Sequence, residues 1–183
     1  MTTTTQTKTS TWSIDPTHSI VEFAVKHLVV TTVKGRFREL EGVLHIDEGR
    51  PENSSVSASV DVASVDTNVA DRDADLRSDN FFNAEKYPKI TFQSTRVERL
   101  DDTNYRVRGD LTIRDVTKPV VLDTEFEGEV DDPWGNRRAG FTATTQISRK
   151  EFNVRWNQLI ESGGAVVSDN VKITLHIETV RQG

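Results

Sequence analysis

The stretch Val171-Lys-Ile-Thr-Leu-His-Ile-Glu178 decides the fold, because apolar and polar side chains alternate along it without a break. A period of two places every second side chain on the same face of a β-strand, so this stretch buries one face and exposes the other. The same alternation marks residues 19–27, 56–62, 90–93, 105–114, 120–127 and 141–147. Together with the less regular stretch 34–47, the sequence predicts about eight half-buried strands.

Short, turn-like connectors join these stretches, for example Asp47-Glu-Gly-Arg-Pro51 and Asp131-Asp-Pro-Trp-Gly-Asn136. Such turns favour antiparallel pairing of strands that follow each other in the chain. Residues 68–80 predict a short helix, and residues 148–160 form a second irregular stretch. An open sheet of this size would leave two unpaired edges. We therefore expect an all-β fold, an eight-stranded antiparallel barrel with one or two short helices.

The amino-acid composition excludes several classes of function. The chain has 183 residues, which fits one domain, and carries 23 Lys and Arg against 29 Asp and Glu, a net charge of −6. This acidic balance argues against a nucleic-acid-binding protein that depends on a broad basic face. The sequence has no Cys, which excludes a disulfide framework, a thiolate metal site and a Cys nucleophile.

The polar N-terminus differs from the rest of the chain. We expect residues 1–11 to be a disordered arm and residues 12–183 to be a single barrel domain. The arm lacks the apolar core of a secretory signal, which predicts a cytoplasmic protein, or a periplasmic or secreted one if a signal has been removed. The apolar runs, such as Leu28-Val29-Val30, are far shorter than the roughly 20 residues of a transmembrane helix, so no such segment is expected.

The inward-facing parity of the strands contains several small residues, namely Ala58, Gly109, Thr124, Gly128 and Ala143. They either interlock with larger neighbours to fill the barrel or leave a tunnel along its axis. The alternation alone leaves both arrangements open.

No constellation of catalytic or metal-binding residues emerges from the sequence. The four His residues are scattered, without the spacing of a zinc site. Asp71, Asp73 and Asp75 resemble the start of a calcium loop, but Leu76 stands where that loop needs Gly and Phe82 where it needs Glu. We therefore expect no catalytic residues, no metal and no cofactor.

Beyond this point the sequence matches a known pattern in several ordered blocks. These are Trp12-Ser-Ile-Asp15, His18-Ser-Ile-Val-Glu-Phe23, Val25-Lys-His27, Val33-Lys-Gly-Arg-Phe37, Arg72-Asp-Ala-Asp-Leu-Arg-Ser-Asp-Asn-Phe-Phe82, Tyr87-Pro-Lys-Ile-Thr-Phe-Gln-Ser-Thr95, Gly109-Asp-Leu-Thr-Ile-Arg114, Thr117-Lys-Pro-Val120 and Leu122. In them the chain resembles the YceI family of lipocalin-like, polyisoprenoid-binding proteins, over residues 12–180. Three positions depart from the family pattern: Asp75 replaces a common His, Asp115 a usual Gly, and Ser148-Arg-Lys-Glu-Phe-Asn153 an Asn-Arg-x-Asp-Phe-Gly block.

The resemblance implies an extended barrel around a hydrophobic tunnel that binds a long-chain isoprenoid or similar fatty amphiphile without catalysis, for storage or transport. It also implies a bacterial protein that forms a homodimer, although no exposed apolar stripe in the sequence identifies the interface. The predicted binding residues for the tail are Phe23, Val25, Phe37, Phe92, Leu122, Phe126, Phe141 and Trp156. The predicted head-group residues are His27, Arg72, Arg77 and Lys150.

Two further function classes compete with a lipid carrier. One is an enzyme, such as a lipid isomerase or cyclase, that uses the barrel as a reaction chamber. It would need an acid or base inside, and His27 and Tyr105 are the inward-facing candidates. The other is a stress-response module with a filled barrel.

Overall fold

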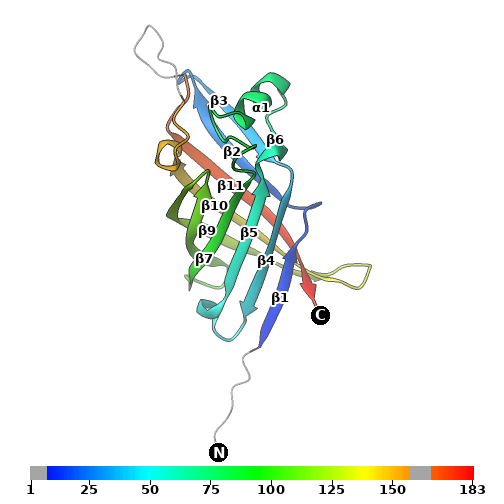
Figure 1. The fold of residues 1–183 in the computed structure, drawn as a ribbon. Helices are drawn as coiled ribbons and strands as arrows, with labels where there is room; N and C mark the ends of the chain where they lie inside the picture. The colour runs from blue at the N-terminus through cyan, green and yellow to red at the C-terminus, as the bar shows by residue number, and fades with distance from the viewer. Residues whose placement is uncertain (1–7, 157–165) are drawn as a thin grey trace, which may run out of the picture.

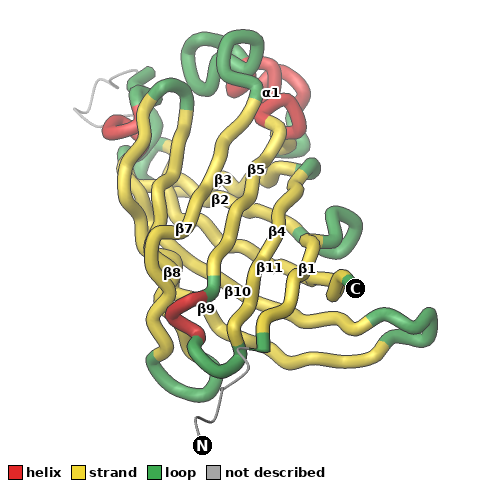
Figure 2. Tube along the Cα trace, turned by 60° about the horizontal axis from the view of Figure 1, so that its bottom comes forward, coloured by secondary structure: helices red, strands yellow, loops and turns green. Residues whose placement is uncertain are grey.

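The computed structural model describes residues 8–156 and 166–183, and their strands form one antiparallel sheet that closes on itself (Figures 1 and 2). The strands are β1 (Thr9–Ile14), β2 (Ile20–His27), β3 (Thr31–Phe37), β4 (Leu40–Asp47), β5 (Ser55–Asp61), β6 (Val65–Asp66), β7 (Lys89–Arg99), β8 (Asn104–Ile113), β9 (Val116–Asp131), β10 (Arg137–Ser148) and β11 (Asn170–Gln182). The helical elements are η1 (Pro51–Asn53), η2 (Val62–Ser64), α1 (Ala70–Arg77) and η3 (Arg149–Phe152).

The ring runs β1-β4-β5-β7-β8-β9-β10-β11 and returns to β1, which pairs with the second half of β11. The first half of β11 pairs instead with β2, and β2 continues into β3 and β6. The long strand β11 thus pairs with two shorter strands, β2 along its first half and β1 along its second half. The predicted antiparallel barrel of eight strands is confirmed.

The first strand begins earlier than the sequence suggests. Residues 9–11 were expected to belong to a disordered arm. However, all three pair with β4, and Thr11 also pairs with β11. Ser10 is buried, and its hydroxyl accepts a hydrogen bond of 2.8 Å from the indole Nε1 of Trp12. The buried indole needs this partner. The expected arm therefore ends at least three residues sooner, and residues 1–7 lie outside the described part of the chain.

Residues 34–47 and 68–80, which lack a regular alternation, form strands and a helix, respectively. Residues 34–47 belong to two strands, β3 and β4, rather than one. The helix predicted over 68–80 is α1, which is shorter and lies at one end of the barrel in Figure 1, together with the β2–β3 hairpin and η3. We call this the α1 end; the opposite end carries the chain ends of β1 and β11 and the β9–β10 hairpin.

The wall between β9 and β10 is only partly closed by backbone pairing. Within the described residues, their ladder runs from Arg137–Asp131 to Thr144–Asp123 and goes no further toward the α1 end. Pro119 lies in the half of β9 that pairs with β8 but not with β10, and it has no N–H to donate. Phe152 of η3, 1% exposed, lies beside a hollow of about 410 Å³ at this seam. Side chains, rather than a ladder, close the barrel here.

Candidate functional site

The barrel encloses a cavity of about 700 Å³. Its wall is formed mainly by apolar side chains that point inward from the strands, as the alternation in the sequence predicts. A volume of this size is in the range of sites that hold one small ligand. The barrel is therefore hollow, and the described residues do not fill it.

All eight residues predicted to bind the tail lie on the wall of this cavity: Phe23, Val25, Phe37, Phe92, Leu122, Phe126, Phe141 and Trp156. Four of the six aromatic rings among them form two contacting pairs. The Phe23 and Phe37 ring centroids are 5.6 Å apart, and those of Phe126 and Phe141 are 5.5 Å apart. These separations suit tilted aromatic packing. Their contact with a ligand stays a prediction.

Two glycines allow aromatic rings to approach the backbone closely. A Cβ atom added at Gly35 would collide with the ring of Phe23, and one added at Gly109 would collide with the ring of Phe92. At these points the small residues interlock with large neighbours. By contrast, Ala58, Thr124 and Ala143 border the open cavity. Gly109 thus interlocks with a large neighbour, whereas Ala58, Thr124 and Ala143 leave open space. Gly128 does neither: it is exposed and absent from the cavity wall, so its predicted inward position is wrong.

Two of the four predicted head-group residues reach the cavity, both at the α1 end. His27 ends β2, and Arg72 lies on α1. Arg72 donates from Nε to the Thr67 hydroxyl and from Nη2 to the Thr67 carbonyl, both at 2.8 Å. These bonds orient the guanidinium at the cavity rim.

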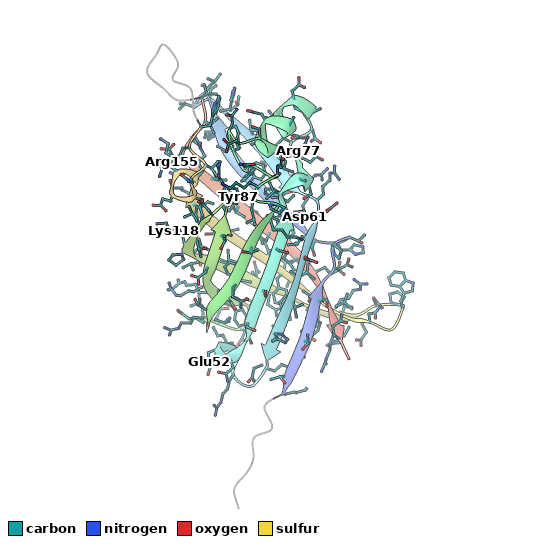
Figure 3. The ribbon with its side chains drawn as sticks, viewed as in Figure 1. Glu52, Asp61, Arg77, Tyr87, Lys118 and Arg155 are labelled. Carbon is teal, nitrogen blue, oxygen red and sulfur yellow. The ribbon has the colours of Figure 1, made fainter. Side chains whose placement is uncertain are left out.

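The other two predicted head-group residues are not brought to the cavity. Arg77 lies at the last turn of α1, where it is labelled in Figure 3, and is absent from the cavity wall. The Nζ atom of Lys150 is 3.2 Å from the Asp169 carboxylate, and the half-buried side chain is absent from the cavity wall. Neither position favours contact with a ligand inside the barrel.

Arg149 is a cavity residue that the sequence did not single out for binding. It is 5% exposed and borders the cavity. Its guanidinium donates to four carbonyls, those of Val154 (2.9 Å), Trp156 (2.8 Å), Val167 (3.2 Å) and Ser168 (2.9 Å). Burial lowers the pKa of this guanidinium from its ordinary value. Arg149 thus connects residues 154–156 with residues 167–168 by hydrogen bonds, and it positions Trp156 at the cavity wall.

The opposite end of the barrel is held by Arg138. Its Nε atom lies 2.6 Å from the Asp132 carboxylate, and its Nη1 atom lies 2.8 Å from Asp15 and 3.4 Å from Glu178. The bond from Arg138 lowers the pKa of Asp132 to about 2. The bond from His18, joined by the one from Arg138, holds the pKa of Asp15 well below its usual range. The network joins β1, β11 and the β9–β10 hairpin.

Asp15, His18 and Glu178 are close enough together to resemble a set of metal ligands among the described residues. However, Arg138 already supplies a positive charge to both carboxylates. The Nδ1 atom of His18 lies 2.8 Å from Asp15 and is engaged as well. The arrangement is a compensated ion network that connects strands.

The two acid–base candidates lie far apart along the barrel. His27 ends β2 at the α1 end, whereas Tyr105 lies at the start of β8, next to the turn at the opposite end. Both border the cavity, but from its two ends. The geometry gives them no shared reaction site.

Among the helices of the described residues, none has the length and apolar character needed to span a bilayer.

Comparison with known proteins places this geometry in a family. A YceI-like domain model matches residues 12–179. A UPF0312 protein of Pectobacterium atrosepticum is 42% identical over 165 residues, which cover 90% of this chain and 82% of that protein. The crystal structure of Campylobacter jejuni YceI superposes with a TM-score of 0.74 at 31% identity, covering 86% of this chain and 90% of that one.

A third similar protein shares the fold at low identity. It is a polyisoprenoid binding domain from Saccharophagus degradans, with a TM-score of 0.67 and 17% identity over 93% of this chain and 98% of that one. The match of the domain model across the barrel, together with the identity to the Pectobacterium protein, settles the relationship. The chain belongs to the family of YceI-like domain proteins.

Proposed function

We propose that this protein binds a long-chain isoprenoid or similar amphiphilic lipid inside the barrel and stores or transports it without chemical change. The observation that carries the proposal is the cavity of about 700 Å³ with its apolar wall. Burying each methylene of a lipid tail contributes roughly 0.8 kcal/mol, so an apolar cavity of this kind supplies affinity without directional contacts. The Saccharophagus degradans domain, described as polyisoprenoid binding, supports the same ligand class.

The polar end of such a ligand would lie at the α1 end. Arg72 uses Nε and Nη2 to bond Thr67, which leaves Nη1 without a protein partner among the described residues. A guanidinium held in this way suits the planar bidentate recognition of a phosphate or carboxylate head group. His27 adds a second polar side chain at the same rim. Selectivity for the head group would therefore come from these two residues, and affinity from the wall.

An enzymatic role has less support. His27 and Tyr105 lie at opposite ends of the cavity, so one substrate atom would not meet both. Acid–base catalysis needs the catalytic group within hydrogen-bond reach of the proton that it transfers. A binding role needs only the wall that the structure describes.

The test is organic extraction of freshly purified protein followed by mass spectrometry, beside native mass spectrometry of the intact chain. A near-stoichiometric long-chain lipid is expected, and its head group would be identified at once. A protein that is empty and also takes up no added polyprenol would overturn the proposal.

A pair of adjacent substitutions in β10 makes the test specific to the cavity. Ala143 borders the cavity, whereas Thr144 has the opposite parity and is absent from its wall. Ala143→Phe places a ring in the cavity and should weaken polyprenol binding by at least about tenfold, which is 1.4 kcal/mol. Thr144→Phe adds the same ring outside and should leave binding unchanged. Equal binding by both variants, each verified as folded by circular dichroism, would place the ligand elsewhere.

A further inference from the structure

The hairpin between β2 and β3 ends in three aliphatic residues that face solvent. Leu28 is 36% exposed, Val29 71% and Val30 78%. These residues form a run of three aliphatic side chains, yet they contribute little to the core. An exposed cluster of this kind commonly marks a surface that meets an apolar partner.

The backbone of this tip is strained. Leu28 has φ 52° and Val29 has φ 66°, and the Val30 N–H donates to the His27 carbonyl at 3.2 Å. The loop between β2 and β3 has three residues, 28–30, and its first two, Leu28 and Val29, lie in the left-handed region that Asn and Gly adopt most readily. A β-branched residue there is a conformational outlier. Polar residues would make a more stable and more soluble turn, so the aliphatic side chains are not explained by folding.

The tip stands at the rim of the cavity. The Leu28 N–H donates to the Val166 carbonyl at 3.0 Å, and His27 forms a β-bridge with Val167. His27, Val166 and Val167 all border the cavity, at the α1 end. The exposed aliphatic side chains therefore lie directly next to the opening where a lipid head group is proposed to lie.

Three lysines flank the tip on the outer face of the sheet. One row across β11, β2 and β3 consists of Lys172, Ala24 and Lys34, and Lys26 lies two pairs nearer the tip. All three lysines are exposed, and within residues 8–156 and 166–183 none of them forms an ion pair. This local group of positive charges contrasts with the net charge of −6 of the whole chain.

We propose that the β2–β3 hairpin docks the protein on an anionic lipid bilayer. Leu28, Val29 and Val30 enter the interfacial region, while Lys26, Lys34 and Lys172 contact lipid phosphates. Three side chains are too small a surface for a stable protein–protein interface, which buries about 800 Å² on each partner. An aliphatic tip with flanking lysines instead suits weak, reversible attachment to a charged lipid surface. The inference rests on the proposed function, because it brings the cavity rim to the membrane that holds the lipid.

The experiment is vesicle co-sedimentation of the full chain. One set of vesicles contains phosphatidylcholine alone, and the other contains phosphatidylcholine with phosphatidylglycerol. Binding is expected to the anionic vesicles, to be at least about tenfold weaker on the neutral ones, and to fall with added salt. Wild-type protein that binds neither set, or both equally, overturns the inference.

The deciding variant is the double substitution Leu28→Asn with Val29→Gly. It installs the preferred turn residues, so thermal stability should be kept or raised while vesicle binding is lost. The matched control is Trp134→Ala, at the tip of the β9–β10 hairpin, because Trp134 is 79% exposed but lies at the opposite end. It should bind vesicles like the wild type. Equal binding by the double variant and the wild type contradicts a docking role for the tip.

A third variant separates charge from insertion. Replacing Lys26, Lys34 and Lys172 by Gln should remove the preference for phosphatidylglycerol, and a retained preference overturns the role of the lysines. Native mass spectrometry of the same samples reports the lipid inside the barrel independently. A double variant that still carries lipid but no longer binds vesicles supports docking. A lipid-loaded wild type that binds no vesicles overturns docking and leaves the proposed function standing, whereas an empty protein that takes up no polyprenol overturns the proposed function.

Discussion

Two arginines hold the two ends of the barrel by different means. Arg138 lies among the carboxylates of Asp15, Asp132 and Glu178, which raise its pKa above the ordinary value. Arg149 is enclosed by the carbonyls of its own loop, and its nearest carboxylate, Asp169, is 3.9 Å away. One site joins elements by formal charge and the other by peptide dipoles.

The difference determines how the contacts at each end of the barrel respond to acid and to salt. An ion network loses stabilising energy when its carboxylates are protonated or when salt screens them. Carbonyls do not titrate, so the contacts around Arg149 are unaffected by moderate acid. The contacts of Arg149 at the α1 end are thus independent of moderate acid, and those of Arg138, which join the first and last described strands, are not.

The largest effect is expected from Arg149→Met. The substitution leaves four carbonyl acceptors without their donor in a buried site, which should lower the free energy of unfolding by about 3 kcal/mol or more. Urea denaturation measures the loss. Arg149→Lys is the control, because an ammonium keeps the charge but cannot span the same carbonyls, and it should recover only part of the stability. A loss below about 1 kcal/mol for Arg149→Met would show that water replaces the guanidinium.

A smaller effect is expected from Arg138→Gln at neutral pH. Three carboxylates would face each other without the guanidinium between them, so the thermal midpoint should fall by several degrees. Differential scanning calorimetry measures it. Arg106→Gln provides the control, since Arg106 is 44% exposed and lies 3.7 Å from Asp123 on the barrel surface. A midpoint equal to that of the wild type would mean that the network contributes nothing.

The acid dependence follows from the lowered pKa values. In the folded state the pKa of Asp132 is about 2, against an ordinary 3.8, and that of Asp15 is lower still. The stability they contribute is fully present above about pH 4 and is lost as the pH falls toward 2. Unfolding curves across this window should show the loss in wild type and a shallower slope in Arg138→Gln. Parallel slopes in the two proteins would assign the acid sensitivity to other groups.

The smallest effect concerns His18. Its hydrogen bond to Asp15 raises the imidazole pKa, while the charge of Arg138 opposes the rise. In Arg138→Gln the pKa of His18 should therefore be higher than in wild type, which an NMR titration of the ring protons would record. A raised pKa contributes stability below the ordinary value near 6.5 and loses it as the pH rises through the folded value. An unchanged or lower pKa in the variant would contradict the proximity of the two groups.

The sequence predicted the cavity wall well because strand parity maps directly onto the faces of a sheet. Once Phe23 or Phe141 is assigned to the inward parity, its direction follows without knowledge of its neighbours. The first strand was missed because Thr9, Ser10 and Thr11 show no apolar alternation; their order comes from β4, β11 and the indole of Trp12. Such tertiary support is invisible in a local pattern.

The rim was harder to predict. Arg77 and Lys150 were chosen for their charge, but charge does not say which way a side chain on a short helix points. The role of Arg149 requires residues 166–168 to return beside η3, a contact that no local spacing encodes. Part of the predicted stretch 148–160 lies outside the described residues, so its remaining positions stay predictions.

The end-to-end pairing of β1 and β2 along β11 has a consequence for how the protein forms. Because β11 is the last described strand to leave the ribosome, the edges of β1, β2 and β10 that pair with it lack their partner until β11 has been synthesised. Contacts between such distant parts of the chain are slow to form. Until then the apolar lining is exposed to water and prone to aggregation. Lipid present during synthesis would cover that lining, so cargo and biogenesis would be coupled.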